Sequence, residues 1–263
     1  MTLEAALAAT ATLVAAAFAA STLERWLVRR RPHELAWTIA LVMFTLASAA
    51  LWLAEAKGWS SATFRTFYLF GAILDVPWLA LGTIYLLAGR TGRGSVADGI
   101  RWGLVIFSGF AAGVMVTTPL RAAVPSRELP EGRALFEPLP RILAAVGSGV
   151  AALVVIGGAL WSAWHLWRDD AFARPSAAEV SPRRLALGNV VIALGTLVLS
   201  ASGTLAGRLG KDTAFALSLV AGVSVLFCGF LIATPPRPDR MRAFTAARSA
   251  PARHPPLPAS PSR

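Results

Sequence analysis

The stretch FYLFGAILDVPWLALGTIYLLAG, residues 67–89, decides the fold class of this chain. Asp75 is its one charged residue, and every other position is apolar, aromatic, small or hydroxyl-bearing. A helix needs about 20 predominantly apolar residues to cross the hydrocarbon core of a bilayer, and this stretch exceeds that length. It therefore predicts a membrane-spanning helix that carries an acid near its middle.

Six further runs of the chain have the same length and character, so we predict an all-α, polytopic bundle of about seven transmembrane helices. The composition agrees, because 56% of the residues are hydrophobic and 15% are charged, whereas soluble domains average roughly 25% charged residues. The seven predicted spans are Leu3–Leu27, Leu35–Ala54, Ala62–Ala88, Ile100–Leu120, Ile142–Trp167, Leu185–Ala206 and Thr213–Thr234.

The distribution of Lys and Arg predicts the orientation of the bundle. Successive connections between the spans lie on opposite sides of the membrane. The connections on one side, together with the carboxyl-terminal tail, hold seventeen basic residues, and the connections on the other side hold eight. The richer set faces the cytoplasm by the positive-inside rule, which places the amino terminus outside and the carboxyl terminus in the cytoplasm of a plasma-membrane protein. The first span has its arginines after the apolar run and Glu4 before it, the reverse of a signal peptide, so we expect it to be retained.

Two domains follow from this pattern: a transmembrane domain over residues 1–235 and a basic tail over residues 236–263. The tail is rich in Pro, Arg, Ser and Ala, a composition that predicts disorder. The net charge of +11 does not indicate nucleic-acid binding, because the arginines stand at the ends of apolar runs and not along one face. The expected partner is the lipid bilayer. The glycine pair Gly109 and Gly113 has the spacing of a helix-association motif, so the formation of a homo-oligomer is left open.

Polar and small residues recur along one face of the third predicted helix at a period near 3.5. They are Tyr68, Gly71, Asp75, Trp78, Gly82 and Tyr85. The second helix repeats the spacing with Thr45 and Ser48, and the sixth with Asn189, Thr196 and Ser200. Such residues mark faces that either pack closely or line a cavity. We predict that these side chains form a ligand- or proton-binding site between the helices, with ordinary small-residue packing as the alternative.

Asp75 is the residue that packing explains least well. It lies about twelve residues from either end of its helix, where an ionised carboxylate costs at least about 2.5 kcal/mol to insert. Pro77 follows two residues later, lacks a backbone N–H and is expected to kink the helix. A carboxyl group beside a broken hydrogen-bond ladder can bind a proton, a small cation or an amine. The alternative is a neutral Asp75 that is hydrogen-bonded to a neighbouring helix.

The sequence also argues against several cofactors, and we predict none. Seven helices with an acid on the third resemble the microbial rhodopsins, but a retinal Schiff base needs a lysine within the seventh helix, and the chain has only Lys57 and Lys211. Paired intramembrane histidines for haem and a cluster of three zinc ligands are both missing from the sequence. No nucleophile motif is present either, so an enzyme is the least favoured reading.

Two functions therefore remain from the sequence. The first is transport or binding of a small polar solute, cation or proton at a mid-membrane site around Asp75. The second is a membrane sensor or scaffold that acts through the basic loops and tail.

Overall fold

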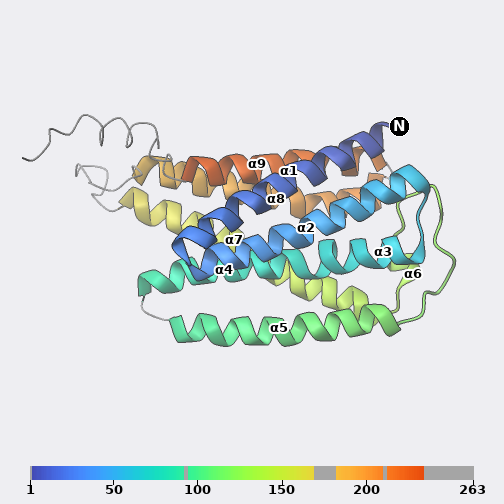
Figure 1. Cartoon of the computed structure of the whole chain (residues 1–263), viewed down its shortest axis with the longest axis horizontal. Coiled ribbons are helices and arrows are strands. Elements are labelled where there is room, and N and C mark those ends of the chain that lie inside the picture. The colour runs from blue at the N-terminus through green and yellow to red at the C-terminus, as the bar shows by residue number, and fades with distance from the viewer. Residues whose placement is uncertain (1, 92–93, 169–181, 210–211, 234–263) are drawn as a thin grey trace, which may run out of the picture.

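The structure is a computed structural model that describes residues 2–91, 94–168, 182–209 and 212–233 of the 263-residue chain. Its described part is helical, without a strand. The long helices run roughly along the long axis of one bundle (Figure 1). The elements are α1 Leu3–Arg29, α2 Pro32–Lys57, α3 Ser61–Phe67, η1 Tyr68–Leu74, α4 Asp75–Thr91, α5 Gly94–Thr117, α6 Gly132–Leu135, α7 Pro138–Arg168, α8 Pro182–Leu209 and α9 Asp212–Ala233.

Within the described residues, six helical stretches are long and apolar enough to cross a membrane. Elements α3, η1 and α4 together form one of them, Ser61–Ala88, which contains the stretch quoted above. In α8 the described apolar part is shorter, Leu187–Leu199. The all-helical membrane fold is thus confirmed with six candidate spans, whereas a seventh span through α8 stays a prediction. The predicted tail lies outside the described residues.

The helix boundaries differ from prediction most clearly in α5. This helix begins at Gly94 and ends at Thr117, whereas the apolar run suggested Ile100–Leu120. Pro119 disfavours helical backbone at the residue before it, which explains the earlier end. The guanidinium of Arg65 donates to the carbonyl oxygens of Met115 and Thr118 and so satisfies acceptors that the helix end leaves free.

The bundle closes into a ring of helices, with one helix outside it. Around the ring, α1 packs on α2, α2 on η1 and α4, α4 on α7, α7 on α8, α8 on α9, and α9 back on α1. The helix outside the ring is α5, which contacts α4, η1 and α7 (Figure 1). Leu79 of α4 packs against all three apolar clusters of the core. This side chain therefore lies at the centre of the ring.

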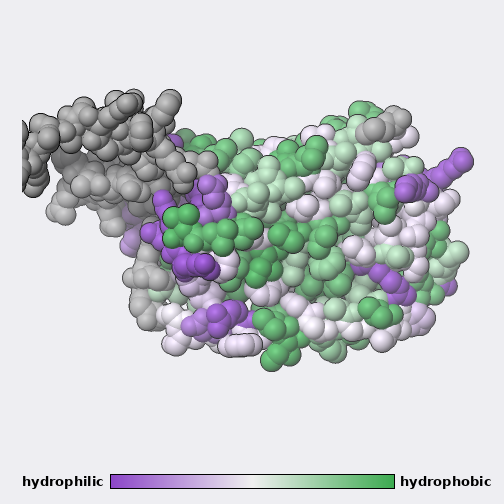
Figure 2. Space-filling view, in the orientation of Figure 1, coloured by the Kyte–Doolittle hydropathy of each residue, from purple (hydrophilic) through white to green (hydrophobic). Residues whose placement is uncertain are grey.

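The surface of the bundle carries many exposed apolar side chains, as expected of a protein that faces lipid. Large apolar side chains such as Leu13, Ile106 and Leu153 are more than 70% exposed. In Figure 2 the apolar residues spread over the middle of the visible face, and the hydrophilic ones gather toward its two ends. An apolar surface of this extent is unfavourable in water and favourable in a hydrocarbon layer.

The connection between α5 and α7 folds back onto the bundle. Phe136 is fully buried and stacks on Phe64 of α3, with ring centroids 5.0 Å apart. The backbone N–H of Trp59 donates to the carbonyl of Ser126 at 3.0 Å. Gly58, with φ of 93°, lies against the same carbonyl, in a backbone conformation that favours glycine. This loop therefore packs against the end of α2 and against α3.

Candidate functional site

Asp75 lies at the junction of a π-helical segment and an α-helix. Its backbone N–H donates to the carbonyl of Phe70, five residues earlier, which is the π pattern of η1. The N–H of the next residue, Val76, donates to the Asp75 carboxyl oxygen Oδ1 at 2.7 Å. Pro77 has no N–H to donate. Three consecutive residues thus depart from the regular helical hydrogen-bond ladder in the middle of this span.

Helix α7 covers the carbonyl groups of this break. The Ser148 hydroxyl donates to the carbonyl of Ala72 at 2.5 Å. The carbonyl oxygen of Ile73, which would pair with residue 77 in a regular α-helix, lies 3.2 Å from the position that a Cβ on Gly147 would take. The absence of a side chain at Gly147 and the hydroxyl at Ser148 together let α7 approach the broken ladder closely.

Helix α2 lies on another side of the same segment. A Cβ on Gly71 would lie 3.0 Å from the Cβ of Ala47, and a Cβ on Gly82 would overlap the ring of Trp37. The two helices run in opposite directions, so Asp75 lies roughly at the level of Met43 in α2 by interpolation between these contacts. Asp75 is buried, and Leu79, one turn further along its helix, lies at the centre of the ring. The carboxyl group therefore belongs to the interior of the bundle.

The other polar residues of the third span have neighbours of their own. The indole Nε1 of Trp78 donates to Ser108 of α5 at 3.1 Å. The Tyr85 hydroxyl donates to Asp98 of α5 at 2.7 Å. Tyr68 packs on Phe136, with ring centroids 4.8 Å apart. These contacts direct Trp78 and Tyr85 toward α5 and Tyr68 toward the loop. The residues predicted to share one polar face therefore contact several different neighbours.

The predicted site residues of the other helices donate hydrogen bonds to other groups of the protein. Thr45 and Ser48 donate to carbonyls of their own helix α2, at 2.7 and 2.9 Å. Thr196 does the same in α8 at 2.9 Å. Asn189 donates across helices to Ser162 of α7 at 2.9 Å. The side chain of Ser200 lies outside those that the structure describes. Ligand contacts by these residues remain predictions.

Several features of the site could not be read from the sequence. The π-helical segment Tyr68–Leu74 has no local sequence signature, and neither does the partnership of Ser148 with Ala72. The consecutive small residues at 147–149 of α7 were the available signal, because small residues permit close helix approach in membranes. Non-α pairing already begins at Tyr68, ahead of Pro77, and the kink at Pro77 stays a prediction.

Charged pairs of the described residues lie at the ends of the helices. Arg121 and Glu137 form a two-bond pair at the loop, with both N–O distances 2.9 Å. The hydrogen bonds from the Arg121 guanidinium lower the pKa of Glu137 below its usual value. Arg101 and Asp98 lie 3.7 Å apart at the start of α5. Within the described residues, no three His, Cys, Asp or Glu side chains gather as a metal site.

Comparison with known proteins assigns no family to this arrangement. No protein-family model matches the chain, and no curated protein is significantly similar to it.

Proposed function

We propose that this protein binds a proton at Asp75 inside the membrane and couples that event to the movement of a small polar solute or cation across the bilayer. The observation that carries the proposal is the hydrogen bond from the Val76 N–H to the Asp75 carboxyl, at the junction of η1 and α4. Intramembrane acids are rare and are functional by default. Helical segments with π pairing are also frequent at functional sites.

The chemistry of the carboxyl group explains how a proton would act on the helix. A carboxylate can only accept hydrogen bonds, whereas the neutral acid has one O–H donor as well. The neutral Asp75 can therefore accept the Val76 N–H and also donate to a backbone carbonyl at the break. Loss of the proton removes that second bond. Protonation of Asp75 thus changes the hydrogen bonding of the backbone where the third span is least regular.

The surroundings of the break suit a movement of this kind. Helix α7 contacts it through Gly147 and Ser148, and α2 contacts it through Ala47 opposite Gly71. Small residues at both contacts let neighbouring backbones slide without large side chains in the way. In this proposal α8 is the seventh span, the amino terminus is outside the cell, and the arginine-rich end faces the cytoplasm of a plasma-membrane protein.

The proposal is tested by proton movement in vesicles. The purified protein is reconstituted with a pH-sensitive dye inside, the external pH is lowered, and the dye is followed for wild type, Asp75→Asn and Asp75→Glu. Asp98→Asn is the matched control, because it makes the same change at an exposed helix end. We expect Asp75→Asn to fall to the rate of protein-free vesicles and Asp98→Asn to keep the wild-type rate.

Helical circular dichroism of each variant shows whether it folds, and Asp75→Glu, which keeps the acid, is expected to retain part of the flux. The proposal fails if Asp75→Asn folds and moves protons as fast as wild type. It also fails if the wild type moves protons no faster than empty vesicles.

A further inference from the structure

Two aromatic contacts cross the interior of the ring of helices. Near the end where the α5–α7 loop packs, the loop end, Phe67 of α3 meets Phe215 of α9 with ring centroids 6.0 Å apart. Near the other end, the arginine end where α1 joins α2, Trp37 meets Phe230 of α9 at 6.1 Å. Helix α9 is adjacent to neither α2 nor α3 in the ring, because α1 stands between them. Trp37 also lies against Gly82 of α4, where a Cβ would overlap its ring, so its side chain reaches into the interior.

Asp75 lies between these two aromatic contacts. Phe67 precedes it by eight residues in the third span. Gly82, which is level with Trp37, follows it by seven. Each contact is therefore about 10 Å from Asp75 along the helix.

Two other buried residues of the predicted site lie between the same contacts. Ser48 is next to the point where α2 packs on Gly71, one turn inside the loop-end contact. Thr196 is next to the point where α8 packs on Leu226, one turn inside the arginine-end contact. Ser48 and Thr196 are 1% and 3% exposed. Polar site residues thus share a stretch of interior that an aromatic contact closes at either end.

Each contact has a buried polar atom without a hydrogen bond beside it. At the loop end this atom is the indole Nε1 of Trp59, whose ring lies 5.6 Å from that of Phe67. At the arginine end it is the carboxyl Oε2 of Glu34, three residues before Trp37 on the same helix. Among the described side chains, these are the two buried polar atoms that lack a partner. Such an atom costs about as much as an aromatic pair contributes, so water that entered at either contact would offset the loss of the ring pair.

From this arrangement we infer that the two contacts are gates that admit water to Asp75, one from each end of the bundle. The loop gate is the pair Phe67–Phe215, and the arginine gate is the pair Trp37–Phe230. Each gate is a single ring pair, so one opens while the other stays closed. Both are closed in this structure. That they open in turn rests on the proton coupling proposed above, whereas the closure itself does not.

The gates are tested with a cysteine placed between them. Ser48→Cys is nearly isosteric, keeps Asp75 and is made together with Cys228→Ser, which removes the one native cysteine. A charged methanethiosulfonate reagent, which does not cross the bilayer, is added to one side of membrane vesicles that contain the full-length protein. Arg127→Cys on the loop and Arg29→Cys on α1 are at exposed positions and identify the end that the reagent reaches. We expect Ser48→Cys to react far more slowly than either of them, from both sides.

Loss of one ring should open one side only. We expect Phe67→Ala to speed labelling of Ser48→Cys from the loop end by about two- to tenfold, the change in open population that one aromatic pair controls. Labelling from the arginine end should stay unchanged. Phe230→Ala should have the reverse effect. Phe67→Leu and Phe230→Leu, which keep apolar bulk without the ring, repeat the comparison should an alanine variant fail to fold.

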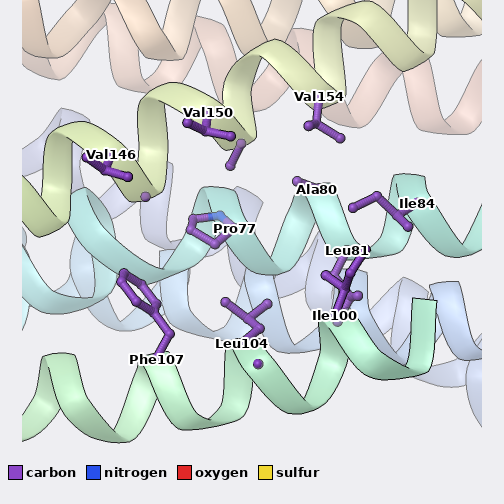
Figure 3. Close-up of a pocket in the computed structure, with 13 residues that line it drawn as sticks. Pro77, Ala80, Leu81, Ile84, Ile100, Leu104, Phe107, Val146, Val150 and Val154 are labelled. Atoms are coloured by element: carbon purple, nitrogen blue, oxygen red, sulfur yellow. The ribbon is translucent and has the colours of Figure 1, made fainter. Parts of the chain in front are cut away.

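Matched controls remove rings that do not cross the interior. Phe227, one turn from Phe230 on α9, contacts Phe18 of the adjacent helix α1 at 4.7 Å. Phe107 of α5 points toward Pro77 in a groove between α4, α5 and α7, outside the ring of helices (Figure 3). We expect Phe227→Ala and Phe107→Ala to keep the parent's labelling rate from both sides.

The unpartnered polar atoms give a second test. Trp59→Phe keeps an aromatic ring and removes the buried N–H, so the closed loop gate is favoured and labelling from the loop end should slow several-fold. Glu34→Leu should slow labelling from the arginine end in the same way. Trp102→Phe, at an exposed position of α5, is the control and should change neither rate.

Three results would overturn the inference: labelling of Ser48→Cys as fast as at the exposed cysteines, equal effects of Phe230→Ala and Phe227→Ala, or a gate variant that opens the opposite end. Unchanged rates in both Trp59→Phe and Glu34→Leu would contradict the part played by the unpartnered atoms. Labelling needs no proton movement, so the two proposals fail separately. Gate-specific labelling in vesicles that move no protons would contradict the proposed function and leave the gates in place.

Discussion

The hydroxyl of Ser148 on α7 donates a 2.5 Å hydrogen bond to the backbone carbonyl of Ala72, 76 residues earlier in the chain. Ala72 belongs to the π-helical segment that precedes Asp75. An acceptor that a disrupted ladder leaves free inside a membrane must be satisfied by another helix, because no water is available there. This bond ties the irregular part of the third span to α7.

Loss of this hydroxyl should weaken the bundle. We expect Ser148→Ala to lower the free energy of unfolding by about 1 kcal/mol, the usual contribution of an interhelical hydrogen bond in a membrane. Thermal unfolding in one detergent measures the change. Ser218→Ala is the control, since its hydroxyl bonds a carbonyl of its own helix α9 at 2.8 Å. Equal losses in the two variants would show that the contact with Ala72 has no special weight.

A side chain at Gly147 should separate α7 from the broken segment. Even a Cβ would lie 3.2 Å from the Ile73 carbonyl oxygen, so we expect Gly147→Leu to destabilise the protein by about 1–3 kcal/mol through overpacking. At Gly149 a Cβ meets no atom within 4 Å. Gly149→Leu should therefore be neutral or slightly stabilising, because leucine favours helix more than glycine does. Thermal unfolding of both variants compares them, and similar stability would contradict the close approach at Gly147.

The pairing of Arg121 with Glu137 should make the order of the α5–α7 loop depend on pH. The pKa of Glu137 is lowered in the folded protein by its bonds to Arg121, so the pair stabilises the loop above the ordinary glutamate pKa of about 4.3. This contribution is lost as the pH falls through the lower folded value. Hydrogen exchange of residues 118–137 should be faster in Glu137→Gln than in wild type at pH 6. The difference should shrink as the pH falls below the ordinary glutamate pKa, and a difference that does not decrease over that range would contradict the role of the carboxylate.

Much of the fold follows from the sequence because membrane helices need long apolar runs. The sequence predicts the span containing Asp75 as Ala62–Ala88, and the structure has it as Ser61–Ala88. The interior of that span was less predictable. A period near 3.5 placed Tyr68, Asp75 and Trp78 on one face, but their neighbours are a loop, the ring interior and α5 respectively. Side-chain partners depend on how helices pack, and spacing along one helix does not specify that.

The central claim is that the carboxyl of Asp75 gains and loses a proton within the membrane. The most direct measurement is infrared difference spectroscopy of the reconstituted protein during a pH titration, because a neutral carboxylic acid has a carbonyl stretch of its own. The proposal predicts a titrating carboxylic-acid band that shifts in deuterium oxide and is missing from the spectrum of folded Asp75→Asn. A spectrum of Asp75→Asn that keeps every titrating acid band of the wild type would contradict it.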